Sequence, residues 1–263
     1  GSDTFFCHLE EREIKQANFN REQKAFQKAD KIIAVSQFVA EKTNSLFASI
    51  KEVTVIPNGI YIDDFQPDIT KRKDGLILYF GTLIRKKGIL ELAHIFNELI
   101  QKNSNCQLLL VGNDAIDAKE QRSTWEICKE IFSVEAIQKV DYLGVVNYDR
   151  MKELINEASV CVFPSLAESF GMVTIEAMAL EKPYVNTDYP WAHEIVEDGE
   201  TGFLVNPKSH AEFAEKINLL LTDKELASNM AKKARQEAIK RFDITKIADQ
   251  NIAVYNSLVG AKS

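Results

Sequence analysis

Short apolar runs alternate along the chain with longer segments in which apolar residues recur every three or four positions. A short run bounded by glycine, proline, asparagine or aspartate is typical of a buried strand, and the longer period is typical of a helix. The pattern predicts strands at 31–35, 53–56, 76–80, 107–111, 139–143, 160–163, 183–186 and 203–205. It predicts helices at 10–29, 37–47, 88–102, 115–132, 148–157, 171–180, 211–221, 223–240 and 244–259. The alternation indicates an α/β fold, a Rossmann-like parallel sheet with helices on both faces.

A Pro-Asn-Gly turn at 57–59, with the polar run that follows it through Asp74, marks a domain boundary. Turn-forming and charged residues of this kind are typical of a linker. We therefore expect a remnant of an N-terminal domain at 1–58, a linker at 59–74 and a Rossmann-like domain at 75–240. A C-terminal helix at 241–263 is expected to pack back toward the N-terminal part. Residues 3–8 read like the end of a strand, and the part before the linker has too few strands for an independent sheet, so we expect a fragment.

The composition is that of an ordinary globular protein. The 263 residues are 45% hydrophobic and 27% charged, and the net charge is −7 with basic residues scattered along the chain. This pattern leaves no single-sign surface to hold a polyanion, so we expect no nucleic-acid partner. The four cysteines lack the close spacing of metal ligands, and we expect reduced thiols and a cytoplasmic protein. No run resembles a signal peptide or reaches the length of a membrane-spanning helix.

Candidate chemistry is concentrated in the run E-S-F-G-M-V-T-I-E at 168–176, just after a predicted buried strand. In an open α/β sheet, ligands bind beyond the carboxyl ends of the strands, where helix N-termini direct free N–H groups at anions. Gly171 opens the helix and lets backbone approach a ligand closely. Glu168 lies in the loop, and Glu176 lies roughly 7.5 Å along the helix axis. Two carboxylates this far apart suit different parts of one ligand, such as its vicinal hydroxyls.

The run at 168–176 resembles the E-x7-E motif of the retaining family 4 glycosyltransferases, which have the GT-B fold. Its setting, F-P-S-L-A-E-S-F-G-M-V-T-I-E-A-M-A-L-E-K-P, closely follows the pattern of that family. The resemblance extends over 75–259 through F-G-T-L-I-R-K-K-G, L-L-L-V-G, Y-L-G-V-V and H-E-I-V-E-D-G-E-T-G-F-L-V. Residues 29–67, with A-D-K-I-I-A-V-S and V-I-P-N-G-I, resemble the end of the family's N-terminal, acceptor-side domain. The implied fold is a GT-B C-terminal domain with a truncated N-terminal domain.

The resemblance assigns roles to the motif. Glu168 would hold hydroxyls of the donor sugar, and Glu176 would hold the ribose hydroxyls of the nucleotide. The backbone amides of Gly171, Met172 and Val173 would meet the sugar and the diphosphate. The alternative is that both glutamates merely favour a helix and its N-terminal end.

A second element, G-T-L-I-R-K-K-G at 81–88, carries three consecutive cations on a strand-to-helix loop. Fixed cations can neutralise the charge that develops on a diphosphate leaving group. Lys87 matches the lysine of the family. Thr82, directly after Gly81, stands where the family often has arginine, so Arg85 or the next lysine would reach the phosphates instead. The alternative is an ordinary solvated face.

Two further assignments rest on the resemblance. Gly144, Val145 and Val146 would meet the base through backbone groups at a strand end. His8 would face the donor sugar, or it is an ordinary histidine near the end of the chain. Glu181 replaces a glycine that usually ends the helix of the motif, so we expect a different termination there.

The function that follows is retaining transfer of a sugar from a UDP- or GDP-sugar to an acceptor hydroxyl, in polysaccharide, glycolipid or glycoprotein synthesis. We expect no cofactor, since the nucleotide sugar is a substrate, and no metal site, since no D-x-D arrangement ends a strand. The acceptor would be a glycan, a lipid-linked glycan or a protein, with peripheral membrane contact through the missing N-terminal domain. Alone, the fragment would be weakly active or inactive. The alternatives are an epimerase or a phosphorylase of the same fold, or a non-catalytic binding or docking module.

Overall fold

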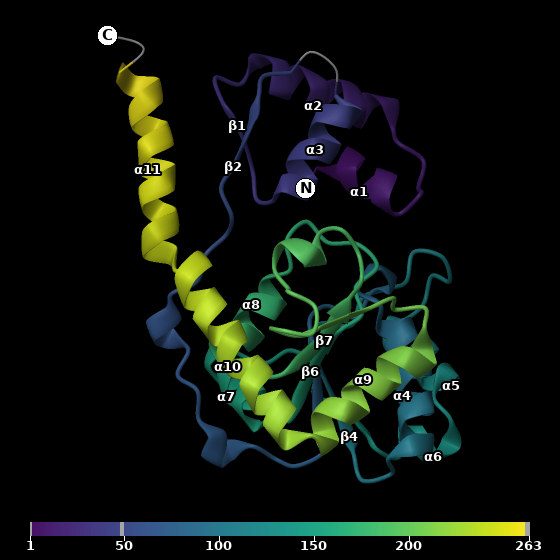
Figure 1. The fold of residues 1–263 in the computed structure, drawn as a ribbon. Coiled ribbons are helices and arrows are strands. Elements are labelled where there is room, and N and C mark those ends of the chain that lie inside the picture. The colour runs from purple at the N-terminus through teal and green to yellow at the C-terminus, as the bar shows by residue number, and fades with distance from the viewer. Residues whose placement is uncertain (1, 48–49, 261–263) are drawn as a thin grey trace.

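The computed structural model describes residues 2–47 and 50–260 and contains two parallel sheets (Figure 1). A two-stranded sheet, β1 (Ile32–Ala34) with β2 (Val53–Val55), belongs to what we call the N-terminal lobe, residues 2–47 and 50–56. A six-stranded sheet belongs to the C-terminal lobe, residues 75–242. Its strands are β3 (Leu76–Phe80), β4 (Gln107–Val111), β5 (Val140–Tyr142), β6 (Val160–Phe163), β7 (Tyr184–Thr187) and β8 (Phe203–Val205). The eight strands predicted from 31 to 205 are confirmed, with ends that move by at most one residue.

The larger sheet has the order β5-β4-β3-β6-β7-β8, and every pair is parallel. The chain builds outward from β3 to β5, then returns to the centre and builds outward in the other direction from β6 to β8. Leu78 of β3 pairs with Leu109 on one side and with Cys161 on the other. The switch in direction therefore lies between β3 and β6, which is where such sheets bind ligands.

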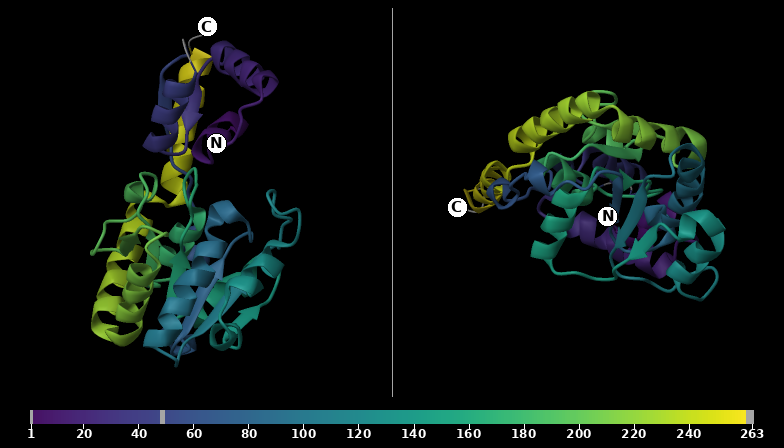
Figure 2. Two further views of the ribbon diagram at one scale, coloured as in Figure 1. Left: turned by 90° about the vertical axis from the view of Figure 1, so that its right-hand side faces the viewer. Right: turned by 90° about the horizontal axis from the view of Figure 1, so that it is seen from below.

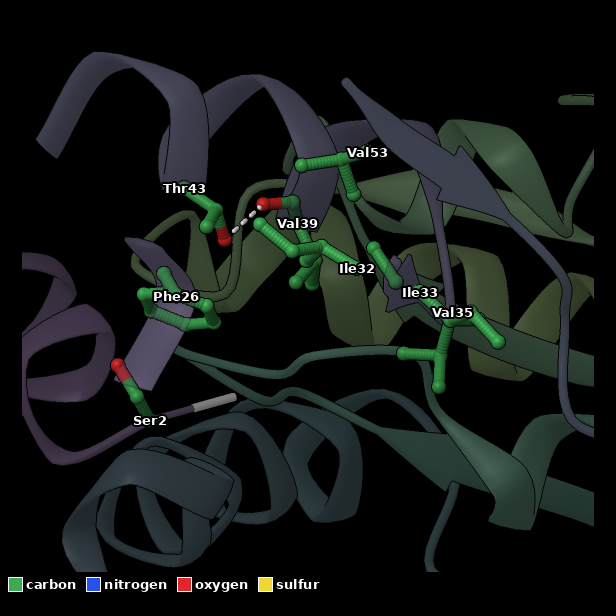
Figure 3. Close-up of a pocket in the computed structure, with 9 residues that line it drawn as sticks. Ser2, Phe26, Ile32, Ile33, Val35, Val39, Thr43 and Val53 are labelled. Carbon is green, nitrogen blue, oxygen red and sulfur yellow. Dashed lines mark hydrogen bonds between the residues drawn. The ribbon is translucent and has the colours of Figure 1, made fainter. Parts of the chain in front are cut away.

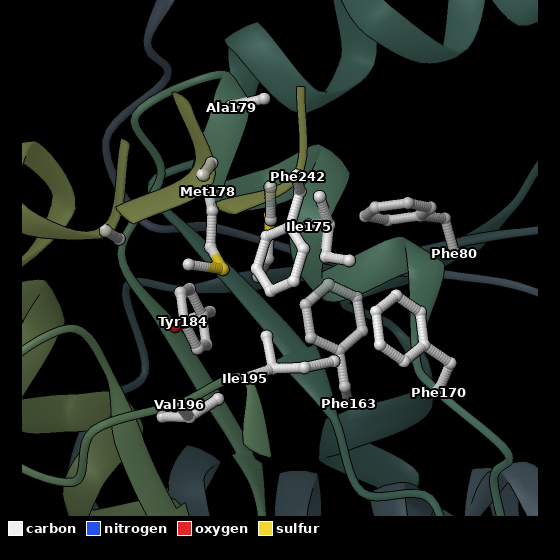
Figure 4. Packing of buried hydrophobic residues seen from close by; sticks show 14 of the residues in the cluster. Phe80, Phe163, Phe170, Ile175, Met178, Ala179, Tyr184, Ile195, Val196 and Phe242 are labelled. Atoms are coloured by element: carbon white, nitrogen blue, oxygen red, sulfur yellow. The ribbon is translucent and has the colours of Figure 1, made fainter. Parts of the chain in front are cut away.

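Alternate residues of the strands are buried against different helices, so the sheet has two cores. One face packs on α4 (Ile89–Lys102), α5 (Thr124–Ile131), α6 (Val134–Ile137) and α9 (His210–Thr222). The other packs on α7 (Tyr148–Glu157), α8 (Met172–Ala179) and α10 (Lys224–Arg241). This second core includes an edge-on pair, Phe80 with Phe163, whose ring centroids are 5.3 Å apart (Figure 4). The predicted α/β architecture with helices on both faces is confirmed.

In the N-terminal lobe, α1 (Asp3–Leu9), α2 (Gln16–Lys28) and α3 (Gln37–Leu46) accompany the small sheet. An apolar hollow of about 230 Å³ lies among Phe26, Ile32, Val39 and Val53 (Figure 3). Its lining contains none of the candidate catalytic or nucleotide-binding residues. All four cysteines of the chain are free, as the sequence predicts, and all four are buried.

The segment after residue 56 is bound to the C-terminal lobe. Ile60 donates its N–H to the carbonyl of Phe242 at 2.9 Å and accepts from the N–H of Ile244 at 2.9 Å. Phe65 is buried, and its carbonyl accepts from Arg235 at 2.9 Å. From this crossing α11 (Ile244–Gly260) extends toward the level of the N-terminal lobe (Figure 1, Figure 2). Among the described residues, no helix has the length and apolar character to cross a membrane.

The prediction that residues 3–8 end a strand is wrong, because they form α1. Ser2 caps the helix by accepting the N–H of Phe5 at 3.2 Å, and Phe5 and Cys7 are buried. The predicted helix at 10–29 therefore starts later, at α2. Between the two helices, Glu11 adopts a left-handed conformation with φ 52°, which ends α1 without a glycine.

The predicted helix at 115–132 is also too long. Residues 113–123 form an irregular loop in which the buried carboxylate of Asp117 accepts the N–H groups of Lys119 at 3.0 Å and Glu120 at 2.8 Å. Helix α5 begins only where Ser123 caps it by accepting the N–H of Glu126 at 3.0 Å. A side chain that satisfies backbone groups outside a helix competes with helix formation.

The expectation of a different helix end at Glu181 is wrong. Glu181 has φ 53°, and its N–H bonds the carbonyl of Met178 at 3.0 Å. The N–H of Lys182 bonds the carbonyl of Ala177 at 3.0 Å. These two bonds are the Schellman arrangement that glycine usually completes, here made by a glutamate in the left-handed region.

The two lobes are joined by hydrogen bonds at the N-terminus of α3. The Glu194 carboxylate accepts the N–H groups of Gln37 at 2.7 Å and Phe38 at 2.6 Å. Ser36 caps the same helix and donates its hydroxyl to the carbonyl of Ser169 at 3.0 Å. A carboxylate at a helix N-terminus is stabilised both by the free N–H groups and by the helix dipole. Glu194 is therefore a charged contact between the lobes.

We expect Glu194→Ala to raise amide hydrogen exchange at Gln37 and Phe38, because their N–H groups lose their acceptor. The cost should be about 1 kcal/mol of local stability, as for the loss of a helix cap. Amide hydrogen exchange measured by mass spectrometry checks this. The matched control is Glu197→Ala, which replaces another glutamate in the segment between β7 and β8. Equal exchange in both variants would contradict the assigned contact.

Candidate functional site

The loops that follow β3 and β6 are bonded to each other at the switch point of the larger sheet. The carbonyl of Lys86 accepts the N–H groups of Leu166 at 2.7 Å and Ala167 at 3.1 Å. Gly88 has φ +69°, and a Cβ there would lie 1.8 Å from the carbonyl oxygen of Pro164. Only glycine fits this close approach of two backbones. The β3–α4 and β6–α8 loops therefore form one unit.

This unit brings Lys87 and Glu168 together. Their side chains form an ion pair between Nζ and Oε1, and the hydroxyl of Ser165 donates to the same carboxylate oxygen at 3.3 Å. The side chains are 26% and 12% exposed, respectively. A partly buried cation and an acceptor-only carboxylate thus lie side by side where the sequence analysis places phosphate and sugar hydroxyls.

Helix α8 begins beside this pair. Gly171, with φ +97°, is its N-cap residue, and Met172 and Val173 lie in the first turn. The first N–H groups of a helix have no acceptor within it, so they can bind an anion. Phe170 and Ile175 are buried in the core that Figure 4 shows, and they fix the entry and direction of the helix.

Glu176 lies in the second turn of α8 and accepts a hydrogen bond from the Tyr148 hydroxyl at 3.0 Å. Burial raises the pKa of Glu176, and the hydrogen bond from Tyr148 opposes that rise. Nearby, Gly144 follows β5 with φ +69° and accepts the N–H of Gly112 at 2.8 Å. The side chain of Val145 is 72% exposed, whereas Val146 packs against the core. The residues predicted to bind the base, the phosphates and the sugar therefore follow the carboxyl ends of β5, β3 and β6. These strands lie in that order across the sheet.

Arg85, which the sequence analysis assigned to the phosphates, is instead bonded to two acidic side chains. It donates to Asp117 at 2.5 Å and to Glu120 at 2.7 Å. Burial alone would raise the pKa of Asp117, but the bonds from Arg85 and from backbone N–H groups lower it. Arg85 thus holds the loop at 113–123. The neighbouring Gly81 donates its N–H to the carbonyl of Val111 at 2.9 Å, and the carbonyl of Thr82 accepts from Tyr79 at 3.1 Å.

His8 is exposed on α1 rather than at the end of a strand. The end of α1 nevertheless reaches the β3–α4 loop. Lys86 Nζ lies 4.1 Å from the ring centroid of Phe6 and 3.8 Å from Glu10. Among residues 2–47 and 50–260, no cluster of three histidine, cysteine or acidic side chains could hold a metal ion.

The motif analysis missed two residues, Tyr148 and Ser165, which bond the two carboxylates of the motif. Both follow the carboxyl ends of strands in sequence, and that position is a usable signal. Tyr148 comes directly after Asn147, the N-cap residue of α7. No pattern of spacing links it to Glu176, because the contact is made between two separate helices, α7 and α8.

A family described as glycosyl transferases group 1 matches residues 62–237, which include both loops and α8. The chain belongs to this family. A second family, Glycosyltransferase Family 4, matches residues 2–64 of this group 1 glycosyltransferase chain. The resemblance that the motifs indicated is thereby confirmed.

Curated relatives include the capsular polysaccharide biosynthesis glycosyltransferase CapM of Staphylococcus aureus, 30% identical over 88% of this chain and 62% of the relative. The N-acetyl-alpha-D-glucosaminyl L-malate synthase of Bacillus anthracis is 26% identical over 87% of this chain and 60% of the relative. This chain therefore spans about 60% of the length of these curated relatives.

Solved structures confirm the GT-B fold. The sucrose-phosphate synthase of Thermosynechococcus elongatus has a TM-score of 0.82 and 26% identity, over 94% of this chain and 63% of that one. Anabaena HepE in complex with UDP-glucose has a TM-score of 0.80 and 25% identity, over 93% of this chain and 68% of that one.

We expect Gly88→Ala to lower the free energy of unfolding by about 1–3 kcal/mol more than Gly144→Ala does, because only the first methyl group overlaps backbone. Both glycines have φ +69°, so the conformational cost is matched, and a Cβ at Gly144 meets nothing within 4 Å. Urea unfolding of the two variants measures the difference. Equal losses would show that the Gly88 crossing is not a tight contact.

Proposed function

We propose that the protein is a retaining glycosyltransferase that moves a sugar from a UDP- or GDP-sugar to an acceptor hydroxyl. The observation that carries this proposal is the meeting of Lys87 and Glu168 beside the N-terminus of α8, with Glu176 on the same helix. The three side chains lie at the switch point of the sheet, where a nucleotide sugar would extend from one side to the other.

Lys87 and the first N–H groups of α8 would stabilise the diphosphate as its leaving oxygen gains charge. Glu168 would accept hydroxyls of the sugar, and Glu176 those of the ribose. The bond from the anomeric carbon to the diphosphate oxygen breaks as the bond to the acceptor oxygen forms on the same face. The acceptor proton goes to the leaving phosphate oxygen. The protein then supplies positioning and charge stabilisation rather than a nucleophile.

The ion pair between Lys87 and Glu168 supports these separate roles in diphosphate and sugar binding. A ligand that carries both an anion and hydroxyl donors can satisfy Lys87 and Glu168 separately, and it would replace the contact between them. The relatives favour the same class of substrate. One is described as making a capsular polysaccharide, and one solved structure contains UDP-glucose. A glycan, lipid-linked glycan or protein acceptor is proposed on that basis.

Calorimetric titration with UDP and with GDP tests the nucleotide part of the proposal. Glu176→Ala is expected to weaken the nucleotide that binds by roughly ten- to a hundredfold, as for loss of a hydrogen bond to a charged group. Glu212→Ala, an exposed glutamate of α9, is the control. A chain that binds neither nucleotide, or binds it equally after Glu176→Ala, would contradict the proposal.

We further propose that the donor is bound without a divalent ion, because Lys87 and the α8 N-terminus supply the positive charge. Nucleotide affinity in EDTA should equal that in buffer alone. Loss of binding in EDTA that manganese restores would overturn this part. Incubation of the sugar nucleotide without acceptor separates the other classes, since an epimerase would change the donor and a phosphorylase would consume inorganic phosphate.

A further inference from the structure

Tyr148 is bound to the candidate nucleotide site from a different helix. It is the first residue of α7, directly after the N-cap Asn147, at the carboxyl edge of the larger sheet. Its hydroxyl donates to Glu176 Oε1 at 3.0 Å. Within the described ranges, Tyr148 is the residue whose side chain bonds this carboxylate.

The Tyr148 ring is held by contacts that do not involve the hydroxyl. Phe65 meets it edge-on, with 6.1 Å between ring centroids and 84° between planes. Lys152, one turn further along α7, places Nζ 5.5 Å from the ring centroid. Phe65 is 2% exposed and is anchored on the linker, whereas Tyr148 is 52% exposed. Phe65 and Lys152 thus hold the ring while about half of the residue remains exposed.

We propose that Tyr148 is a positioning residue for nucleotide binding. Its hydroxyl fixes the Glu176 carboxylate so that Oε2 and the remaining lone pairs receive the ribose hydroxyls. This inference rests on the proposed function, because it assumes that Glu176 binds ribose. A carboxylate has about four acceptor sites, so one bond from Tyr148 leaves room for a diol.

The charges around the pair are consistent with a donor role. Burial, the Glu176 charge and Asp64 all raise the pKa of Tyr148, so the hydroxyl keeps its proton at neutral pH. Lys152 is the cation that faces the ring from α7. Burial raises the pKa of Glu176, and the Tyr148 bond stabilises its ionised form. Removal of the hydroxyl therefore raises the pKa of Glu176 further.

The test compares Tyr148→Phe with wild type in calorimetric titrations of UDP and of 2′,3′-dideoxy-UDP. The guanine analogues are used if GDP is the nucleotide that the wild-type chain binds. We expect Tyr148→Phe to weaken the ribonucleotide about fivefold, as for one hydrogen bond, and to leave the dideoxy analogue unchanged. As the pH falls, ribonucleotide affinity should be lost at a higher pH in Tyr148→Phe than in wild type. Tyr255→Phe, an exposed tyrosine on α11, is the matched control.

The outcomes separate this inference from the proposed function. If wild type binds the ribonucleotide more tightly than Glu176→Gln does, yet Tyr148→Phe matches wild type, the positioning role is overturned. If Tyr148→Phe weakened both nucleotides equally, Tyr148 would have a structural role only. If Tyr148→Phe bound the ribonucleotide more tightly than wild type, the hydroxyl would compete with ribose, which also overturns the positioning role. In the double variant Tyr148→Phe/Glu176→Gln the effect of the tyrosine should vanish. A wild-type chain that binds neither nucleotide overturns the proposed function and this inference with it.

Discussion

The crossing of two backbones at Gly88 and Pro164 is the constraint on which the candidate site depends. Because a Cβ at Gly88 would lie 1.8 Å from the Pro164 oxygen, the β3–α4 and β6–α8 loops can approach this closely only with glycine at this position. The carbonyl of Lys86 then bonds two N–H groups of the second loop. Lys87 and Glu168, 81 positions apart in sequence, meet as a result. Preorganisation of a charged site by rigid backbone contacts lowers the cost of arranging it around a ligand.

Each carboxylate of the motif has a protein partner, Glu168 with Lys87 and Glu176 with Tyr148. A partly buried carboxylate without a partner would be costly, and it would tend to take up a proton. The two partners differ in kind. A diphosphate could replace Glu168 as the partner of Lys87. The Tyr148 hydroxyl donates one hydrogen bond to Glu176 and leaves the other acceptor sites of that carboxylate available. The loop before α8 therefore carries an exchangeable contact at Glu168, and the helix itself carries a lasting one at Glu176.

Local sequence patterns were sufficient where burial decides the structure, as in the apolar strands β3, β4 and β6 and the loop that carries Glu168. They failed where a side chain replaces the usual signal. Glu181 ends α8 in a left-handed conformation that is usual for glycine. The apolar residues of α1 resemble a strand in sequence, and the only helix signal before them is the cap residue Ser2. Partners of long side chains were also beyond reach. The bonds of Arg85 to Asp117 and of Tyr148 to Glu176 join separate loops and helices, and no periodicity encodes them.

The segment between the two sheets is attached to the C-terminal lobe through Ile60 and Phe65. Ile60 exchanges backbone hydrogen bonds with residues 242 and 244, and the Phe65 carbonyl is held by Arg235. The predicted linker at 59–74 is therefore bound to the C-terminal lobe, and only residues 57–59 separate this anchor from Ile56, which donates its N–H to the carbonyl of Ala34 in β1. So short a connection has little slack. Relative motion of the lobes at this point would therefore be rotation rather than translation.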